Sequence, residues 1–295
     1  MSLFTWLQNR TRGFAGQRSS SHSSPRRRTT FRPQIEVLEG RDVPSTLTVT
    51  NNLDDGSKGS LRYEIGKAHS GDTIVFAPTL DGQTITLRAS ELDIATSLNI
   101  QGPGAGLLTI SGGRGVTSIN GVRVFAVEFR ATVTLSGLTI TGGGGRAYAA
   151  FGQNNGFDNE GGGIFNLGTL TVSGCTVSGN YADPNSASSD GGGIYNAGKM
   201  TVAGSTISDN FATYVSDVAL NPVPTNNGGG IYNAAGATLT ISNTTVSGNF
   251  AGSAGGGIYN AGTAAALTVL DCTFSSNRPD NIFGPYADGG GNIFN

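Results

Sequence analysis

The hexapeptide GGGIFN occupies Gly161–Asn166, and the closely similar GGGIYN returns at Gly191–Asn196, Gly228–Asn233 and Gly255–Asn260. A variant, GGGNIFN, stands at Gly289–Asn295. Each of the first four copies is followed by a second shared segment: TLTVSGCTVSGN (Thr169–Asn180), KMTVAGSTISDN (Lys199–Asn210), TLTISNTTVSGN (Thr238–Asn249) and ALTVLDCTFSSN (Ala266–Asn277). Self-similarity at intervals of about 20–50 residues is the sequence signature of a repeat architecture. The second half of the 295-residue chain is therefore a tandem repeat.

Each repeat unit contains three short stretches in which apolar and polar residues alternate. The stretches are rich in β-branched residues, and Gly, Asn or Ser stands at the joints between them. Alternation with a period of two is typical of β-strands, and no helical period of 3.6 occurs in this half. We therefore predict an all-β chain that forms a right-handed parallel β-helix, with one repeat for each coil.

The lengths of the units support stacked coils. Successive units start 30, 37, 27 and 34 residues apart, and nearly all of this variation lies between the final Asn of one unit and the next GGG. Insertions confined to one point of each repeat are typical of loops that leave a solenoid along one edge. The predicted loops are Tyr181–Asp190, Phe211–Asn227, Phe250–Ala254 and Arg278–Asp288.

Stacking of like residues predicts ladders along the solenoid. We expect a buried ladder of Ile164, Ile194, Ile231 and Ile258. We also expect two asparagine ladders, Asn166–Asn196–Asn233–Asn260 and Asn180–Asn210–Asn249–Asn277, joined by side-chain hydrogen bonds.

The two cysteines test this stacking. Cys175 and Cys272 share one repeat position but lie three coils apart. At about 4.8 Å for each coil their separation is roughly 14 Å, beyond the limit of about 7 Å between the Cα atoms of a disulfide. Both thiols are therefore predicted to be free and buried.

The first half continues the strand pattern without the GGG signature. Short β-type runs occupy Thr46–Thr50, Asp72–Phe76, Gln83–Leu87, Ser97–Ile100 and Leu107–Ser111, and Val133–Gly143 already resembles the later repeat. The exception is Ser60–His69, where Leu61, Ile65 and Ala68 lie at helical spacing behind a Ser in the N-cap position. Since a solenoid needs a covered end, this segment is predicted to be a capping helix.

Residues 1–45 differ in composition from the rest. They hold 8 Arg and 3 acidic residues, a net charge of +5, whereas the remaining residues hold 10 basic and 17 acidic residues, a net charge of −7. Such a basic, Ser-rich stretch is predicted to be a disordered leader or targeting segment before a β-helix over 46–295. Beyond residue 131 only Arg146, Lys199 and Arg278 are positive, so we expect no nucleic-acid partner.

The chain lacks the apolar stretch of roughly 7–15 residues of an ordinary secretory signal, and it has no 18-residue apolar window that would predict a membrane span. The run IEVLEGRDVPS (Ile35–Ser45) is similar to the LExR-type element near the start of many extracellular proteins of planctomycete bacteria, which also follows a basic, Ser-rich leader. This resemblance implies a secreted or cell-surface protein without an ordinary signal peptide.

The GGGI units with Ser-x-Asn endings resemble the repeats of chlamydial polymorphic outer-membrane proteins, which pair GGA[ILV] with FxxN. Gly replaces the Ala here, and only Phe274–Asn277 has the literal FxxN. The run GSLRYEIGKAHSGDTIVF (Gly59–Phe76) is similar to the opening coil of many bacterial extracellular β-helix proteins. Together these resemblances imply an adhesive or structural β-helix and no assigned reaction.

The alternative is a polysaccharide lyase or glycoside hydrolase that acts on acidic glycans, since many β-helix proteins cleave such sugars. A hydrolase needs carboxylates a few ångströms apart, which in a solenoid means acidic residues at one repeat position on neighbouring coils. Asp209 and Asp271 lack such partners. We therefore predict no catalytic residues, although a site could assemble from the loop acids Asp158, Glu160, Asp183, Asp190, Asp217, Asp280 and Asp288.

No cofactor or metal site is expected either. Only two His are present, His22 in the leader and His69 after the predicted helix, and no Gly-rich run is followed by Lys-Ser/Thr as in a phosphate-binding loop. The Asp-bearing Gly nonapeptide of calcium-binding β-rolls is absent too.

The edge that carries the loops is the predicted ligand surface, for a polysaccharide or a cell-surface protein, because aromatic side chains beside Asn and Asp suit such contacts. Alternatively, the loops fold back and cover the flank of the solenoid. The sequence does not indicate an oligomeric state. The given sequence ends on a repeat copy, from which we expect either that the last coil is protected by a loop or another molecule, or that the parent sequence is longer. The candidate binding residues are Tyr181, Phe211, Tyr214, Phe250, Phe283 and Tyr286.

Overall fold

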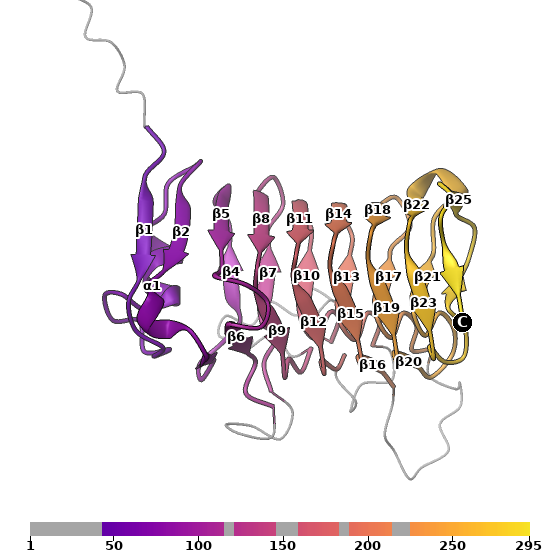
Figure 1. Cartoon of the computed structure of the whole chain (residues 1–295), viewed down its shortest axis with the longest axis horizontal. Coiled ribbons are helices and arrows are strands. Elements are labelled where there is room, and N and C mark those ends of the chain that lie inside the picture. The colour runs from indigo at the N-terminus through magenta and orange to yellow at the C-terminus, as the bar shows by residue number, and fades with distance from the viewer. Residues whose placement is uncertain (1–42, 115–120, 146–158, 183–188, 214–224) are drawn as a thin grey trace, which may run out of the picture. The chain divides into compact units, whose positions relative to one another are not determined.

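The structure is a computed structural model, and it describes residues 43–114, 121–145, 159–182, 189–213 and 225–295. Residues 42–295 form one compact unit. Within it the chain winds as a solenoid whose strands succeed one another along the axis, from β1 to β25 (Figure 1). The predicted disordered leader falls almost wholly outside the described residues.

Three parallel sheets run along the solenoid, and every named strand pair in them is parallel. The first sheet contains β1 (Thr46–Val49), β2 (Thr73–Phe76), β5 (Leu98–Gln101), β8 (Thr132–Ser136), β11 (Thr169–Ser173), β14 (Lys199–Ala203), β18 (Thr238–Ser242), β22 (Leu267–Leu270) and β25 (Ala287–Asp288).

The second sheet follows the first around each coil. It contains β3 (Gln83–Thr86), β6 (Leu108–Ser111), β9 (Thr139–Thr141), β12 (Thr176–Ser178), β15 (Thr206–Ser208), β19 (Thr245–Ser247), β23 (Thr273–Ser275) and β26 (Ile293–Phe294). Short 3-10 helices, η1 (Pro78–Leu80) and η2 (Ala264–Ala266), interrupt two of the connections.

The third sheet, called sheet C below, carries the Ile-Phe/Tyr-Asn segments of the first four repeat copies. The fifth copy departs from the prediction, because its Ile293–Phe294 pairs with β23 in the second sheet, and the strand that continues sheet C lies inside the predicted loop Arg278–Asp288. It contains β4 (Leu92–Ile94), β7 (Phe125–Val127), β10 (Ile164–Asn166), β13 (Ile194–Asn196), β17 (Ile231–Asn233), β21 (Ile258–Asn260) and β24 (Ile282–Phe283). A separate two-stranded sheet pairs β16 (Phe211–Ala212) with β20 (Phe250–Ala251) at the start of two predicted loops. The strands of coil n therefore pair with those of coils n − 1 and n + 1, as the repeat predicts.

Alternate residues of each strand fill the interior. The Ile ladder of β10, β13, β17 and β21 is in register, and all four side chains are fully buried. The buried asparagine side chains hydrogen-bond to one another between coils. Asn166 donates from Nδ2 to Oδ1 of Asn196 at 2.7 Å, and Asn180 donates in the same way to Asn210 at 3.0 Å. Both predicted asparagine ladders continue to their last member.

The predicted capping helix is confirmed as α1 (Leu61–Lys67). The Ser60 hydroxyl accepts a hydrogen bond from the backbone N–H of Tyr63 at 3.3 Å, which stabilises the helix start. Leu61 and Ile65 are buried against the first coils. The helix therefore covers part of the N-terminal end of the core, next to β1 and β4.

The prediction for the cysteines is also confirmed, because Cys175 and Cys272 are free and buried. Burial raises the pKa of both thiols. None of the helices in the described ranges is long and apolar enough to cross a membrane.

Candidate binding surface and carboxylate pair

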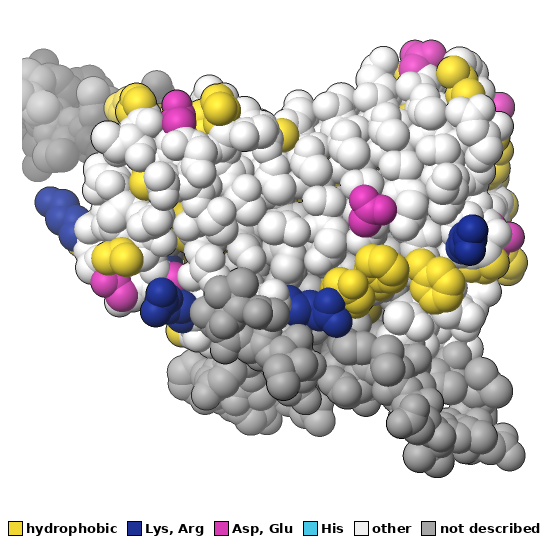
Figure 2. Space-filling model, turned by 60° about the horizontal axis from the view of Figure 1, so that its bottom comes forward, with side chains coloured by type: hydrophobic (Ala, Val, Ile, Leu, Met, Phe, Trp, Pro, Cys, Tyr) yellow, Lys and Arg dark blue, Asp and Glu magenta, His cyan; other side chains and the backbone are white. Residues whose placement is uncertain are grey.

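A row of outward side chains, called the flank row below, follows the second asparagine ladder. Tyr181, Phe211, Phe250 and Arg278 each come directly after a ladder asparagine, and they lie in register on successive coils. Because the asparagine amide is bonded inside the solenoid, the next residue points outward. Figure 2 shows hydrophobic side chains gathered in a short row along this flank, with Lys or Arg side chains nearby.

Arg114 extends the flank row by one further step. Its guanidinium carbon lies 3.3 Å from the centre of the Tyr181 ring, and the rings of Tyr181 and Phe211 stack with their centroids 4.7 Å apart and their planes 10° apart. The Arg114 Nε is buried and has no hydrogen-bond partner within the described residues. A cation over an aromatic face is stabilised by about 0.5–2 kcal/mol.

The flank row thus combines apolar surface with positive charge. Phe250 is 38% exposed, Tyr181 and Phe211 are half-buried, and Arg278 is exposed at the far end from Arg114. A surface that has a guanidinium at each end of an aromatic stretch suits an extended ligand with negative groups.

A second aromatic ladder lies on sheet C. The rings of Phe165, Tyr195, Tyr232, Tyr259 and Phe283 stack with centroid distances of 5.4, 5.0, 5.1 and 5.1 Å and interplanar angles of at most 18°. Since neighbouring ring faces cover one another, the inner rings of this ladder offer a ligand only their edges and hydroxyl groups. Exposure increases along the ladder, from 4% at Phe165 to 46% at Phe283.

The six predicted binding residues are therefore divided between different places. Phe283 ends the sheet C ladder, and Tyr286 is half-buried and packs against the core. Tyr214 lies outside the described residues. The remaining three, which belong to the flank row, are Tyr181, Phe211 and Phe250.

Two carboxylates occupy neighbouring coils at the residue before GGG. Glu160 precedes Gly161 and is 8% exposed, and its Oε2 accepts the backbone N–H of Asp190 at 2.6 Å. Oδ1 of Asp190 in turn accepts the backbone N–H of Asn227 at 2.7 Å and its side-chain N–H at 3.2 Å. These bonds form a third polar ladder, called the pre-glycine ladder below, at the point where the loops rejoin the coils.

Arg123 lies beside this ladder and binds the backbone of Glu160. Its Nη2 and Nε donate to the backbone carbonyl of Glu160 at 2.8 and 3.0 Å, and its Nη1 donates to the Glu91 carboxylate at 2.8 Å. The guanidinium also lies 4.6 Å from the centre of the Phe165 ring. It therefore ties the end of one loop to the start of sheet C.

The environment separates the pKa values of the two carboxyls. Burial, followed by the charge of Asp190, raises the pKa of Glu160 to about 8. Burial raises the pKa of Asp190 to about 6, against the effect of its bonds to Asn227. Burial also raises the pKa of Tyr195, and that of Tyr232 to about 12, so both nearby phenols are neutral at pH 7. Two carboxyls with different pKa values are an arrangement that general acid–base catalysis uses.

The sequence interpretation placed Glu160 and Asp190 in the loops and missed their alignment. The signal was present, because the residue before each of the first four GGG copies is Glu160, Asp190, Asn227 and Ala254 in turn. Counting the repeat from this residue would have put two acids on one ladder. Within the described ranges, no group of three or more His, Cys, Asp or Glu side chains converges to hold a metal ion.

Parallel strands wound into coils, with internal asparagine ladders and loops along one edge, define a right-handed parallel β-helix protein. The family model described as "Right handed beta helix region" matches residues 109–292, and the chain belongs to this family. No curated protein matches the chain. Among solved structures it is similar to the pectin methylesterase PemA from Erwinia chrysanthemi, with 10% identity over 82% of this chain and 80% of that one and a TM-score of 0.34.

Proposed function

We propose that the protein is a non-enzymatic β-helix that is secreted or held at the cell surface and that binds an anionic polymer, such as an acidic polysaccharide or the acidic surface of a protein. The flank row is the binding surface. The observation that carries this proposal is the continuous stack of Arg114, Tyr181 and Phe211, followed in register by Phe250 and Arg278. The resemblance of the repeats to those of polymorphic outer-membrane proteins supports an adhesive role.

The spacing of the flank row explains why a polymer is the expected ligand. Each coil adds one side chain at the strand spacing of about 4.8 Å, so the row offers regularly spaced contacts along the solenoid axis. A polymer that lies along this axis contacts several coils at once, and weak single contacts add up along it.

Affinity electrophoresis tests the proposal. The full-length protein is run through gels that contain polygalacturonate, alginate or uncharged dextran. We expect both acidic polymers to retard the protein, dextran to leave its migration unchanged, and Arg114→Gln and Phe211→Ala each to reduce the retardation at least threefold. Phe129→Ala is the matched control, because Phe129 is 69% exposed and lies beside the Arg130 guanidinium but outside the flank row. Equal retardation of all variants would contradict the proposed surface.

The second candidate is cleavage of an acidic glycan, and the Glu160–Asp190 pair is the observation that favours it. A hydrolase uses one protonated and one ionised carboxyl. Both carboxyls here already accept backbone hydrogen bonds between coils, so a structural role comes first. A simple assay distinguishes the two candidates. The protein is incubated with polygalacturonate or alginate, and the release of reducing ends or unsaturated products is measured. Release by the wild type that is lost in Glu160→Gln would favour the enzyme.

A further inference from the structure

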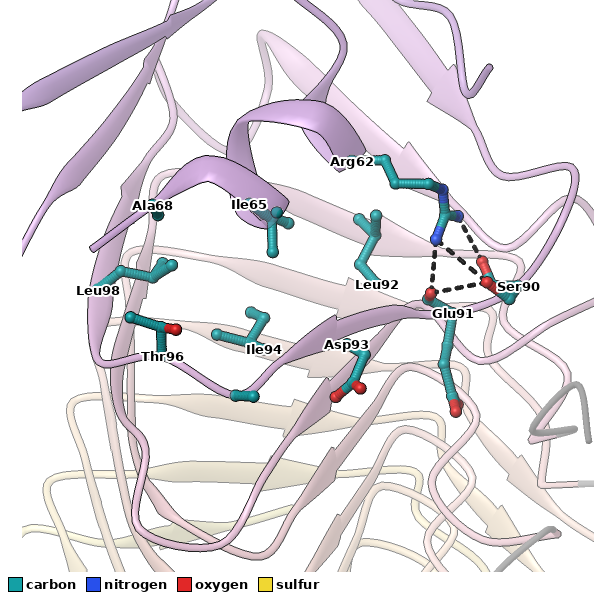
Figure 3. Close-up of a pocket in the computed structure, with 12 residues that line it drawn as sticks. Arg62, Ile65, Ala68, Ser90, Glu91, Leu92, Asp93, Ile94, Thr96 and Leu98 are labelled. Carbon is teal, nitrogen blue, oxygen red and sulfur yellow. Dashed lines mark hydrogen bonds between the residues drawn. The ribbon is translucent and has the colours of Figure 1, made fainter. Parts of the chain in front are cut away.

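A pocket of about 400 Å³ lies between α1 and β4, far along the chain from the flank row (Figure 3). Ile65 and Ala68 reach into it from the helix side, and Leu92 and Ile94 line it from the strand side. Gly66 faces open space, because no atom lies within 4 Å of a Cβ added there. The capping helix therefore does not fill the end of the first coil completely.

The strand edge at this pocket carries no second strand, although α1 packs beside it. Within the described residues β4 is the terminal strand of sheet C and pairs with β7 alone. The Leu92 N–H donates to the carbonyl of Val124 at 2.9 Å, and the Ile94 carbonyl accepts the N–H of Glu128 at 3.0 Å. Because successive residues of a strand direct their backbone groups to opposite sides, the N–H and C=O of Asp93 point away from β7, to the side on which α1 and the pocket lie.

The two arginines nearest the pocket are neutralised. Arg62 is held by Asp54 at 2.7 Å and also donates to the carbonyls of Ser90 and Glu91. Arg123, on the neighbouring coil, is bound to the carboxylate of Glu91 at 2.8 Å. These pairs neutralise both guanidiniums, whereas the ammonium of Lys67 on the last turn of α1 lies over the Tyr63 ring, 5.8 Å from its centre.

The negative charges are not neutralised to the same degree. Asp93 stands on the strand at the pocket, and the carboxyl of Glu128, one coil further on, lies close enough to interact with it. Burial raises the pKa of both groups, and the charge of Asp93 raises the pKa of Glu128 further. Glu128 in turn lowers the pKa of Asp93 through a side-chain hydrogen bond, and a cation placed beside the pair would stabilise the charged form of both carboxyls.

We propose that this pocket binds a short extended peptide that carries a Lys or Arg, and that the peptide adds to β4 as a further strand of sheet C. Its backbone would pair with the free N–H and C=O of Asp93. Its basic side chain would take the next place in the outward ladder, about 4.8 Å from Asp93. The two flanking side chains would point inward, between α1 and the apolar side chains of β4. Addition of a strand to an open sheet edge is a common mode of peptide binding.

The chemistry of the partner follows from this register. The peptide needs an apolar–basic–apolar core, because alternate residues of a strand face opposite sides. An acidic residue in the central position would stand beside Asp93 and be repelled. The site therefore selects an extended peptide with a positively charged central side chain. This binding does not involve the flank row.

Fluorescence polarisation of a labelled peptide, Ser-Val-Lys-Val-Ser, against the full-length protein tests the proposal. Three variants of the protein separate the parts of the site. Asp93→Asn removes the charge and keeps the backbone N–H, whereas Gly66→Leu fills the pocket from the helix side and favours the helix. Asp209→Asn is the control, because it removes an exposed carboxylate on a distant coil.

We expect saturable binding to the wild type and to Asp209→Asn, at least fivefold weaker binding to Asp93→Asn, and at least tenfold weaker binding to Gly66→Leu, all with unchanged circular dichroism. A peptide with Glu for Lys, and one with both valines N-methylated, should not bind. The proposal is overturned if the Lys peptide does not saturate below about 1 mM, if the Glu or N-methylated peptide binds equally well, or if Gly66→Leu leaves the affinity unchanged.

Discussion

Replacement of Glu160 by Gln is expected to stabilise the protein at alkaline pH. The Gln carbonyl can still accept the backbone N–H of Asp190, so the pre-glycine ladder keeps its bond. In the wild type, the folded-state pKa of Glu160, about 8, lies above the ordinary value of 4.5. Stability from the protonated carboxyl is therefore fully present below about pH 4.5 and is lost as the pH rises through 8.

The size of this effect follows from the shift. At 1.36 kcal/mol for each pKa unit the whole loss is at most about 5 kcal/mol, and about 1.4 kcal/mol of it falls between pH 7 and pH 9. Asp190, with a pKa of about 6, contributes mainly below this window. The two buried thiols, whose pKa values are also raised, lose stability in the same window, so Glu160 is isolated by the difference between the wild type and Glu160→Gln.

The assay is urea unfolding at pH 7 and pH 9, followed by circular dichroism and compared with the control Asp209→Asn. We expect the wild type and the control to lose about 1.4 kcal/mol more than Glu160→Gln over this range. If all three proteins lose the same free energy of unfolding, the carboxyl of Glu160 is already ionised at pH 7, and the reasoning from its burial is refuted.

Three further predictions concern the scaffold. Asn210→Ala should lower the free energy of unfolding by about 3 kcal/mol in urea titrations, because it removes four buried hydrogen bonds. Gly192→Ala should lower the free energy of unfolding by about 2 kcal/mol or more, since an added Cβ lies 2.4 Å from the backbone of Phe211. The control Gly66→Ala should not destabilise the protein, and equal losses of free energy in the two variants would contradict the prediction. The two cysteine thiols should react with a thiol reagent only after unfolding, because both are buried with raised pKa values, and rapid reaction of the native protein would show that the core opens.

The architecture could be predicted from the sequence because the repeat carries its own register. Ile164 and its equivalents mark the core, and the asparagines mark two corners, so the strand partners follow from alignment of the copies. The capping helix could be predicted from Ser60 and the spacing of Leu61 and Ile65. The short strands β4 and β7 were not predicted, because three residues give too little alternation to recognise.

The candidate site could be predicted only in part. Aromatic residues after the ladder asparagines were recognised, but ring stacking depends on side-chain rotamers that sequence does not give. Arg114 was missed because it lies more than 60 residues before Tyr181 and belongs to no repeat copy. Glu160 and Asp190 were missed because they had been assigned to loops whose lengths vary, although the residue next to GGG has a constant place.

The asparagine ladders give the solenoid a direction. In both of them every amide donates toward the C-terminal neighbour and accepts from the N-terminal side. The amide dipoles are therefore aligned head to tail over several coils, and hydrogen bonds in such chains strengthen one another. A coil can join this array in only one polarity, with its acceptors toward the preceding coil. Lengthening or shortening of the protein by whole repeats preserves that order, whereas a coil inserted in reverse would break two chains of aligned dipoles at once.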